Sequence, residues 1–517
     1  CNVAIGQNAL LQNTTGACNT AVGRFSLDNN TTANGNTAVG YESLGANTTG
    51  TRNVAVGKNA MLSSTTASDS VMLGTTAGDA ITTGTSNTGV GADVMSSTTT
   101  GDFNVAMGNS ALGANTTADN NTAIGFFSML LNTTGTGNAA VGRDSLRCNT
   151  TGNNNSALGK DALKLNTTAS SNTAVGNSVL TTNTTGASNT AVGAGAMFAN
   201  TTAANNTAVG VDALAANTTG ADNTAMGTES LKDHTTGGNN TAYGAYSATN
   251  TTTGQGNVAL GRAALETNTT GNFNSAVGQS VLLANTTGSC NTTVGYSAME
   301  YNTTGVCNVA MGYRAGHRIT TGNNNVAIGS DTMFGTNSKT GNNNTGVGYQ
   351  SLFCLTSGAQ NAGLGMSSLY SVTSGSNNVA LGYESGADAM FSVTGASNKI
   401  IIGNNSSIDA YIKIDWTVTS DLRDKTNIGT VPHGLDFVNQ LNPISYQFKK
   451  SRENDTPSGV IRYGFKAQEI LALEGENNVL VNNDNEDALK LTGAYLLPVL
   501  VNAIKELKAE IELLKNK

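Results

Sequence analysis

Ser420 and Lys425 are the two residues in this sequence whose types and spacing best suit covalent chemistry. A serine hydroxyl is a weak nucleophile until a neighbouring base removes its proton. Lysine can be that base when burial lowers the pKa of its amine toward neutrality. A turn between the two positions would bring amine and hydroxyl together, as a catalytic Ser-Lys pair requires. The alternative interpretation of the same residues is a turn serine beside a solvated lysine.

The residues around this pair form a longer motif, Ser-Asp-Leu-Arg-Asp-Lys-Thr-Asn-Ile, which runs from Ser420 to Ile428. Two further segments, Leu441–Tyr446 and Tyr463–Glu469, complete a pattern within the last 98 residues. This pattern resembles the intramolecular chaperone domain of endosialidase tail spikes, which many phage fibres and myelin regulatory factor share.

The resemblance implies a self-cleavage reaction. In it, Ser420 attacks the carbonyl of Thr419, Lys425 takes the proton, and the chain breaks between Thr419 and Ser420. Such a serine peptidase acts once, on its own chain, and needs no external substrate. The resemblance also implies that three chains assemble before the break, so that the domain trimerises and aligns whatever precedes it.

The end of the chain predicts a helix that packs against copies of itself. Its apolar residues alternate three and four apart, which is the seam of a coiled coil. They are Leu497, Leu500, Ile504, Leu507, Ile511 and Leu514. Simple rules for seam residues favour a parallel dimer, whereas the family that the domain resembles forms trimers, and we expect a homotrimer.

A repeat with a period of 17 residues precedes this module. Twenty glycines follow one another at that spacing from Gly6 to Gly329, and Gly348, Gly365, Gly382 and Gly403 continue the series less regularly. A unit this short cannot bury its own apolar face and must stack on its neighbours. Glycine and the run Asn-Thr-Thr-Gly disfavour helix. We therefore predict a mainly β protein, a parallel β-roll or β-solenoid with two short strands per coil, about 110 Å long at ~4.8 Å per coil.

Each coil offers two apolar anchors, the residue before the glycine and the residue four after it, with a small residue between them. In the coil of Gly40 these are Val39, Leu44 and Ser43. Asparagines such as Asn13, Asn30 and Asn47 are expected to form a hydrogen-bonded ladder. In two variant coils we expect Ile81 and Ile319 to replace the bulk missing at Gly78 and Gly316. The unit resembles the short repeats of trimeric autotransporter adhesin heads, which are left-handed β-rolls packed three together.

Cysteines and histidines give no sign of a metal or cofactor site, and we expect none. Cys1 and Cys18 lie at equivalent places in adjacent coils, as do Cys290 and Cys307. These cysteines could form disulfides along one chain or between chains. The alternative interpretation is that each cysteine fills a small, half-buried site in its coil. The other two cysteines are Cys148 and Cys354. The three histidines have no ligand spacing and are expected at the surface: His234, His317 and His433. Asn-Thr-Thr matches a glycosylation sequon, but we interpret it as turn chemistry.

The two parts of the chain differ in their density of charged residues. Residues 1–419 hold 34 charged side chains and the last 98 residues hold 26. We predict a shaft over 1–403, a neck strand over 404–419 around Trp416, a chaperone and self-processing domain over 420–488, and a coiled-coil helix over 489–517.

The net charge of −8 argues against nucleic acid as a partner, and no stretch approaches the ~20 apolar residues of a membrane span. Starting at Cys1 part-way through a repeat, the sequence is expected to be a fragment or processed form.

These features predict a trimeric fibre or adhesin shaft that attaches to a host or surface receptor, a glycan among the candidates. It would belong to a virion, as a tail fibre, or to the outside of a cell. One alternative is a bacterial or algal cell-surface adhesin that uses the same C-terminal module. Less favoured are a glycan-hydrolysing spike, since no carboxylate pair stands out from the repeat, and an ice-binding protein, since the repeated threonines lie in a turn.

Overall fold

The computed structural model describes residues 1–387, 393–404, 406–407, 420–451, 454–475, 478–483 and 489–516. Residues 1–379 with 393–400 make one compact unit, and the remaining described residues make a second. The predicted neck strand Ile408–Thr419, with Trp416, lies outside the described residues.

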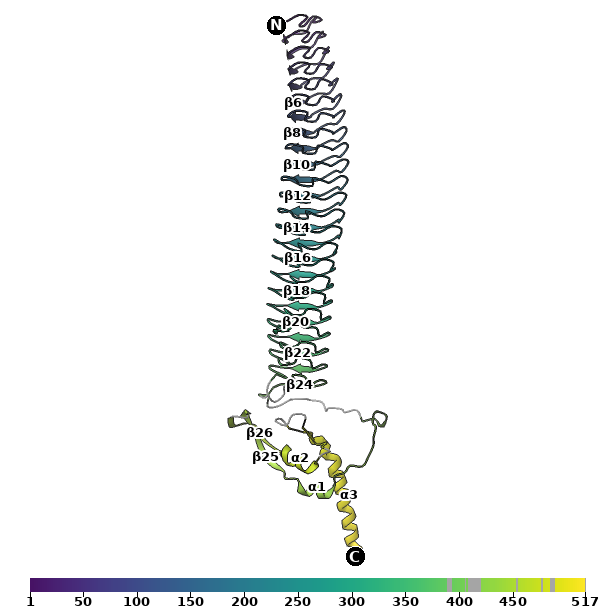
Figure 1. Cartoon of the computed structure of the whole chain (residues 1–517), viewed down its shortest axis with the longest axis vertical. Coiled ribbons are helices and arrows are strands. Elements are labelled where there is room, and N and C mark those ends of the chain that lie inside the picture. Colours follow the sequence, from purple (N-terminus) through teal and green to yellow (C-terminus); the bar gives the residue numbers. More distant parts are fainter. Residues whose placement is uncertain are drawn as a thin grey trace. The chain divides into compact units, whose positions relative to one another are not determined.

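The repeat folds as a parallel β-solenoid in which each coil contributes one strand to a 24-stranded sheet. Figure 1 shows these strands stacked in one column. Neighbouring strands from β1 to β20 pair in register at a separation of 17 residues, as Ala4 with Ala21 and Ile5 with Val22; β20 and β21 pair at 19 residues. The predicted mainly β solenoid is therefore confirmed. The strands are β1 (Val3–Ile5), β2 (Thr20–Val22), β3 (Thr37–Val39), β4 (Val54–Val56), β5 (Val71–Leu73), β6 (Thr88–Val90), β7 (Val105–Met107), β8 (Thr122–Ile124), β9 (Ala139–Val141), β10 (Ser156–Leu158), β11 (Thr173–Val175), β12 (Thr190–Val192), β13 (Thr207–Val209), β14 (Thr224–Met226), β15 (Thr241–Tyr243), β16 (Val258–Leu260), β17 (Ser275–Val277), β18 (Thr292–Val294), β19 (Val309–Met311), β20 (Val326–Ile328), β21 (Thr345–Val347), β22 (Ala362–Leu364), β23 (Val379–Leu381) and β24 (Ile400–Ile402).

The expectation of two strands per coil is wrong. After the repeat glycine the chain runs through successive turns, in which Glu42 and Leu44 have φ values of 55° and 51°. An extended strand cannot contain these left-handed residues. One three-residue strand and a long turn segment therefore make up each coil.

The predicted core is half right. Leu44 and Ser43 are fully buried, but Val39 is not, and the buried strand residue is Ala38. Side chains of a strand alternate between its two faces, so only the middle residue of three can point inward. Alanine fits the narrow interior, and the valine that was predicted as an anchor points out of the coil.

The repeat glycine allows the coils to approach one another. Gly40 has a φ of 140°, and a Cβ atom placed on it would lie 2.3 Å from the carbonyl oxygen of Gly57 in the next coil. Residues with a side chain neither adopt this backbone conformation readily nor fit this contact. This close backbone contact explains why a glycine recurs once in each coil.

The predicted asparagine ladder is present. Asn30 Nδ2 donates to Asn13 Oδ1 at 2.9 Å, and Asn47 Nδ2 donates to Asn30 Oδ1 at 3.0 Å. A second ladder passes through Asn19 and Asn36, where the backbone N–H of Asn36 donates to Asn19 Oδ1 at 2.9 Å. Apart from Asn13 in the first coil, these side chains are buried inside the solenoid, where the apolar interior strengthens each bond. The sequon asparagine Asn47 is thus an interior residue whose amide already donates.

The two variant coils fill their interior as expected. A Cβ atom on Gly78 would lie 2.8 Å from Ile81 Cδ1, and one on Gly316 would lie 2.9 Å from Ile319 Cδ1. Both isoleucines are buried. Each isoleucine therefore occupies the space that a leucine fills in the standard coil.

The expectation of surface histidines is wrong for two of them. His234 is fully buried at a position of the asparagine ladder, where its Nε2 donates to the carbonyl of Gly237. His317 is 8% exposed and packs edge-on against Tyr301. Burial lowers the pKa of both imidazoles. The third, His433, is half-buried and stacks on Phe437 with ring centroids 4.2 Å apart.

The second unit contains a small α+β arrangement. Its elements are the short helices η1 (Leu422–Asp424) and η2 (Gly493–Tyr495), the helices α1 (Leu435–Gln440), α2 (Ala467–Glu474) and α3 (Leu496–Lys515), an antiparallel hairpin of β25 (Ile444–Ser451) and β26 (Asn454–Gly464), and a short pair of β27 (Val481–Asn482) and β28 (Lys490–Leu491). Its core consists of Phe437, Ile470, Leu480, Val481, Leu496 and Val499.

Two carboxylates hold this second unit together. Glu474 is buried and accepts backbone N–H groups of Val479, Leu480 and Val481 at 2.7–3.0 Å. Glu506 of α3 accepts the N–H of Leu435 at 2.6 Å, at the N-terminus of α1. A carboxylate there satisfies a backbone donor that the helix leaves free.

Candidate active site

A short turn positions the predicted site. The helix η1 begins after Asp421, whose side chain accepts the backbone N–H of Arg423 at 2.8 Å. It ends when the N–H of Lys425 reaches the carbonyl of Leu422 at 3.2 Å. Aspartate is a preferred cap because its side chain satisfies a free donor of the first turn. The turn reverses the chain between Ser420 and Lys425.

The structure brings the two predicted residues together. Lys425 Nζ lies 2.8 Å from Ser420 Oγ and donates to it. Both side chains are exposed within the single chain. The distance is within the range over which a neutral amine could take the hydroxyl proton. The predicted cleavage partner Thr419 lies outside the described residues.

Sequence reasoning did not single out the residues that shape this turn. Arg423 holds both carboxylate oxygens of Asp421, with its Nη2 at 2.6 Å from Oδ2 and its Nε at 3.1 Å from Oδ1. The hydrogen bond from Arg423 lowers the pKa of Asp421. The preference of aspartate for helix N-caps is the signal that could have identified it.

The predicted seam of α3 is uncovered within one chain. Its six residues are between 41% and 70% exposed. The same helix turns Leu496, Val499 and Ala503 toward the core of the second unit. One face of α3 thus packs against the core of its own unit, while a second apolar face has no partner among the described residues.

The six cysteines are free thiols. The half-buried slot that was expected for the cysteines is right only for Cys148 and Cys354. It is wrong for Cys1, Cys18, Cys290 and Cys307, which are exposed. Among the described residues no cluster of three His, Cys, Asp or Glu side chains could hold a metal ion. Within the same residues, no helix combines the length and apolarity that a membrane crossing needs.

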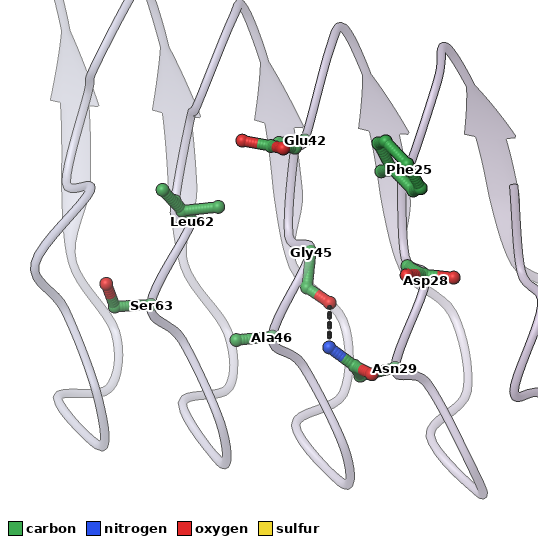
Figure 2. A pocket seen from close by; sticks show the side chains of 8 residues that line it. All are labelled: Phe25, Asp28, Asn29, Glu42, Gly45, Ala46, Leu62 and Ser63. Atoms are coloured by element: carbon green, nitrogen blue, oxygen red, sulfur yellow. Dashed lines mark hydrogen bonds between the residues drawn. The ribbon is translucent and has the colours of Figure 1, made fainter. Parts of the chain in front are cut away.

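An open depression lies on the turn side of the first coils. Figure 2 shows Gly45 and Ala46 between larger residues of the two adjacent coils, with Asn29 Nδ2 donating to the carbonyl of Gly45 at 2.9 Å. The lining is completed by Phe25, Asp28, Glu42, Leu62 and Ser63. The hollow therefore results from small residues in one coil rather than from a set of converging groups.

Comparison with known protein families gives a match that coincides with this site. The family model Peptidase S74, described as the chaperone of endosialidase, matches residues 420–480. The match begins at Ser420 and includes η1, α1, the β25–β26 hairpin and α2. None of the curated proteins matches the chain. Residues 420–480 are accordingly similar to the chaperone of endosialidase, and a β-solenoid precedes them in the chain.

Proposed function

We propose that this chain is a trimeric fibre or adhesin shaft whose C-terminal chaperone domain aligns three copies and then cuts itself off between Thr419 and Ser420. The observation that carries the proposal is the 2.8 Å contact between Lys425 Nζ and Ser420 Oγ at the first residue of the matched domain. In this proposal the shaft binds a surface receptor, with glycans among the candidates. It does so either as the tail fibre of a virion or as an adhesin on a cell.

The cleavage step needs only the chain and water. Lys425 accepts the proton of Ser420 Oγ as the oxygen bonds to the carbonyl carbon of Thr419. The C–N bond between the two residues breaks, and the proton passes to the new amine of Ser420. Water then hydrolyses the ester, which leaves a carboxyl group on Thr419 and restores the serine hydroxyl. The arrangement follows the general rule that a serine nucleophile needs a base within hydrogen-bond reach.

The exposure of both residues supports a particular order of events. Burial favours the neutral form of a lysine amine, which is the form that accepts a proton. A neutral amine requires a cover that the single chain lacks at Lys425. Neighbouring copies supply that cover in the proposal, so cleavage follows assembly. A chain that has not assembled keeps its chaperone.

The α3 seam supports assembly through the tail. Six apolar side chains at alternating three and four residue spacing are mostly uncovered, which is the surface that a coiled coil buries. Docking three tails places the preceding shafts side by side at the same coil. Removal of the tail then leaves the shaft held by its barrier to unfolding.

The decisive experiment compares the wild-type chain with Ser420→Ala on a denaturing gel, with intact mass measurement. We expect wild-type protein to give a shaft ending at Thr419 and a 98-residue fragment beginning at Ser420, and the variant to stay whole. Lys425→Ala should behave as Ser420→Ala does. Full-length wild-type protein after assembly would refute cleavage.

The chaperone claim has its own test. Deletion of residues 420–517 should give aggregated shaft, because 24 similar coils offer many wrong alignments between copies. The full-length Ser420→Ala chain, which keeps its tail, should give soluble protein without cleavage. Soluble trimer from the deleted chain would remove the need for a chaperone while leaving the cleavage result unaffected.

A further inference from the structure

The outward face of the β-sheet carries an apolar column along the whole solenoid. The last residue of every strand from β1 to β24 is apolar, and none of them is buried. We call these residues the outer column: Ile5, Val22, Val39, Val56, Leu73, Val90, Met107, Ile124, Val141, Leu158, Val175, Val192, Val209, Met226, Tyr243, Leu260, Val277, Val294, Met311, Ile328, Val347, Leu364, Leu381 and Ile402.

Charge is excluded from this face. The first residue of each strand also points outward, and it is Thr, Val, Ala, Ser or Ile in all 24 strands. The shaft has charged residues elsewhere: the position directly after the repeat glycine holds Arg24, Lys58, Arg143 and Lys160. Solvent-facing strand positions in an isolated solenoid have no reason to stay apolar at every repeat, because water accepts polar side chains there.

The extent of the column points to a large contact. An apolar side chain about one-third exposed presents roughly 50 Å². Over 24 coils this amounts to on the order of 1,000 Å² per chain, against about 800 Å² for one side of a standard stable interface. Soluble monomers rarely leave a continuous apolar patch of that size uncovered.

The spacing of the outer column indicates what kind of partner can cover it. Successive rungs are one coil apart, about 4.8 Å, and they continue in register for 24 strands. A partner that covers every rung must present apolar groups with the same rise over the same length. Another copy of this solenoid has that rise, whereas a globular protein would match only a few rungs.

We propose that the outer column is the surface by which the shafts of separate copies pack against one another. This inference rests on the assembly proposed above and adds the face that the shafts bury. Each rung meets the equivalent rung of a neighbour, so the side chains interdigitate along a dry seam. The turn side of each coil, with its charged residues and the depression of Figure 2, then faces outward.

A photo-crosslinking experiment on the full chain tests this packing. Benzoyl-phenylalanine replaces Val192, which is 36% exposed in the outer column. The matched control replaces Thr202, an exposed turn residue between β12 and β13. We expect covalent oligomers of the shaft to form at least tenfold more from position 192 than from position 202, with sedimentation giving the mass of a trimer.

The possible failures are distinguishable. A trimer by sedimentation that crosslinks from 202 and not from 192 overturns the packing face and leaves the proposed function standing. A monomer by sedimentation overturns the proposed assembly and, with it, this inference. A dimer that crosslinks from 192 supports the face and overturns the trimer.

Charge substitution gives a second test, in which crosslinking from position 192 is measured again with cations in the outer column. Val141→Lys, Val175→Lys and Val209→Lys together place cations on alternate rungs, far enough apart to spare the coil itself. Thr151→Lys, Thr185→Lys and Thr219→Lys make the matched set in exposed turns. We expect the first set to abolish shaft-to-shaft crosslinks and the second to keep them; equal behaviour of the two sets contradicts the proposal.

Discussion

Lys425 donates to Ser420 across a turn that Asp421 and Arg423 close. The contact therefore depends on residues that take no part in the proposed proton transfer. Asp421 caps the turn through the N–H of Arg423 and is held in turn by that guanidinium. Within the single chain, the Asp421–Arg423 pair thus sets the geometry of Ser420 and Lys425, the proposed nucleophile and base.

Removing the cap should slow cleavage. Asp421→Ala frees the first turn and lets Lys425 move away from Ser420, and a misplacement of about 1 Å can cost on the order of 100-fold in rate. A time course of the cleaved fraction on a gel measures the effect. Asp424→Ala is the control, since this exposed carboxylate of the same turn does not cap it. Equal rates for the two variants would show that the cap does not position the pair.

Charge in the α3 seam should block both assembly and cleavage. Leu500→Asp with Leu507→Asp buries two carboxylates in the predicted coiled coil, which is strongly unfavourable. We expect monomeric or aggregated protein by sedimentation and at least tenfold less cleavage than wild type. Lys505→Asp changes charge on the same helix outside the seam and should leave both unchanged. Normal cleavage in a monomeric seam variant would separate the reaction from assembly.

The repeat glycine and a neighbouring glycine should differ sharply in tolerance. Gly40→Ala puts a Cβ atom 2.3 Å from Gly57 O at a φ of 140°, so we expect local opening to become easier by about 3 kcal/mol. Gly35→Asn is the control: a Cβ there lies 3.7 Å from its nearest neighbour, and Asn120 has a φ of 59° at the equivalent position. Hydrogen exchange in the adjoining coils measures both. Similar protection in the two variants would contradict the close-contact argument.

His234 should make one coil sensitive to acid. Burial lowers its pKa below the ordinary value of 6.5, so the unfolded coil binds more protons than the folded one. Stability is then complete above about pH 6.5 and falls as the pH drops toward the folded pKa. We expect hydrogen exchange around this coil to quicken at pH 5 relative to pH 7.5, after correction for intrinsic rates.

Two substitutions test that assignment. His234→Asn restores the ladder residue of most other coils and should remove the acid response. Asn217→His should add a second response in the preceding coil. An unchanged acid response in His234→Asn would assign it to another group.

The repeat made the solenoid predictable because one 17-residue spacing is incompatible with most folds, and the apolar residue at Leu44 had to face inward. The orientation of Val39 could not be obtained in the same way. Two apolar positions five residues apart, Val39 and Leu44, suggest a shared core. The single strand and the left-handed residues Glu42 and Leu44 instead turn Leu44 inward and Val39 outward. The number of residues per strand decides this, and periodicity does not report it.

The candidate site divides along similar lines. Ser420 and Lys425 were identifiable from their types and from the motif around them. The roles of Asp421 and Glu506 depend on backbone donors that only the folded chain presents. His234 was misplaced because an isolated histidine in a polar turn looks solvated, whereas its position in the repeat is the buried one that Asn217 occupies in the previous coil.

The stacking direction of the coils has a mechanical consequence. Backbone hydrogen bonds such as Thr20 N–H to Asn36 O join each coil to the next, so a pull along the stack loads them coil by coil rather than together. Each coil that opens releases 17 residues, about 58 Å of extended chain in place of about 4.8 Å of height. A shaft of this kind therefore dissipates mechanical energy by stepwise unfolding, in near-equal extensions on the order of 50 Å.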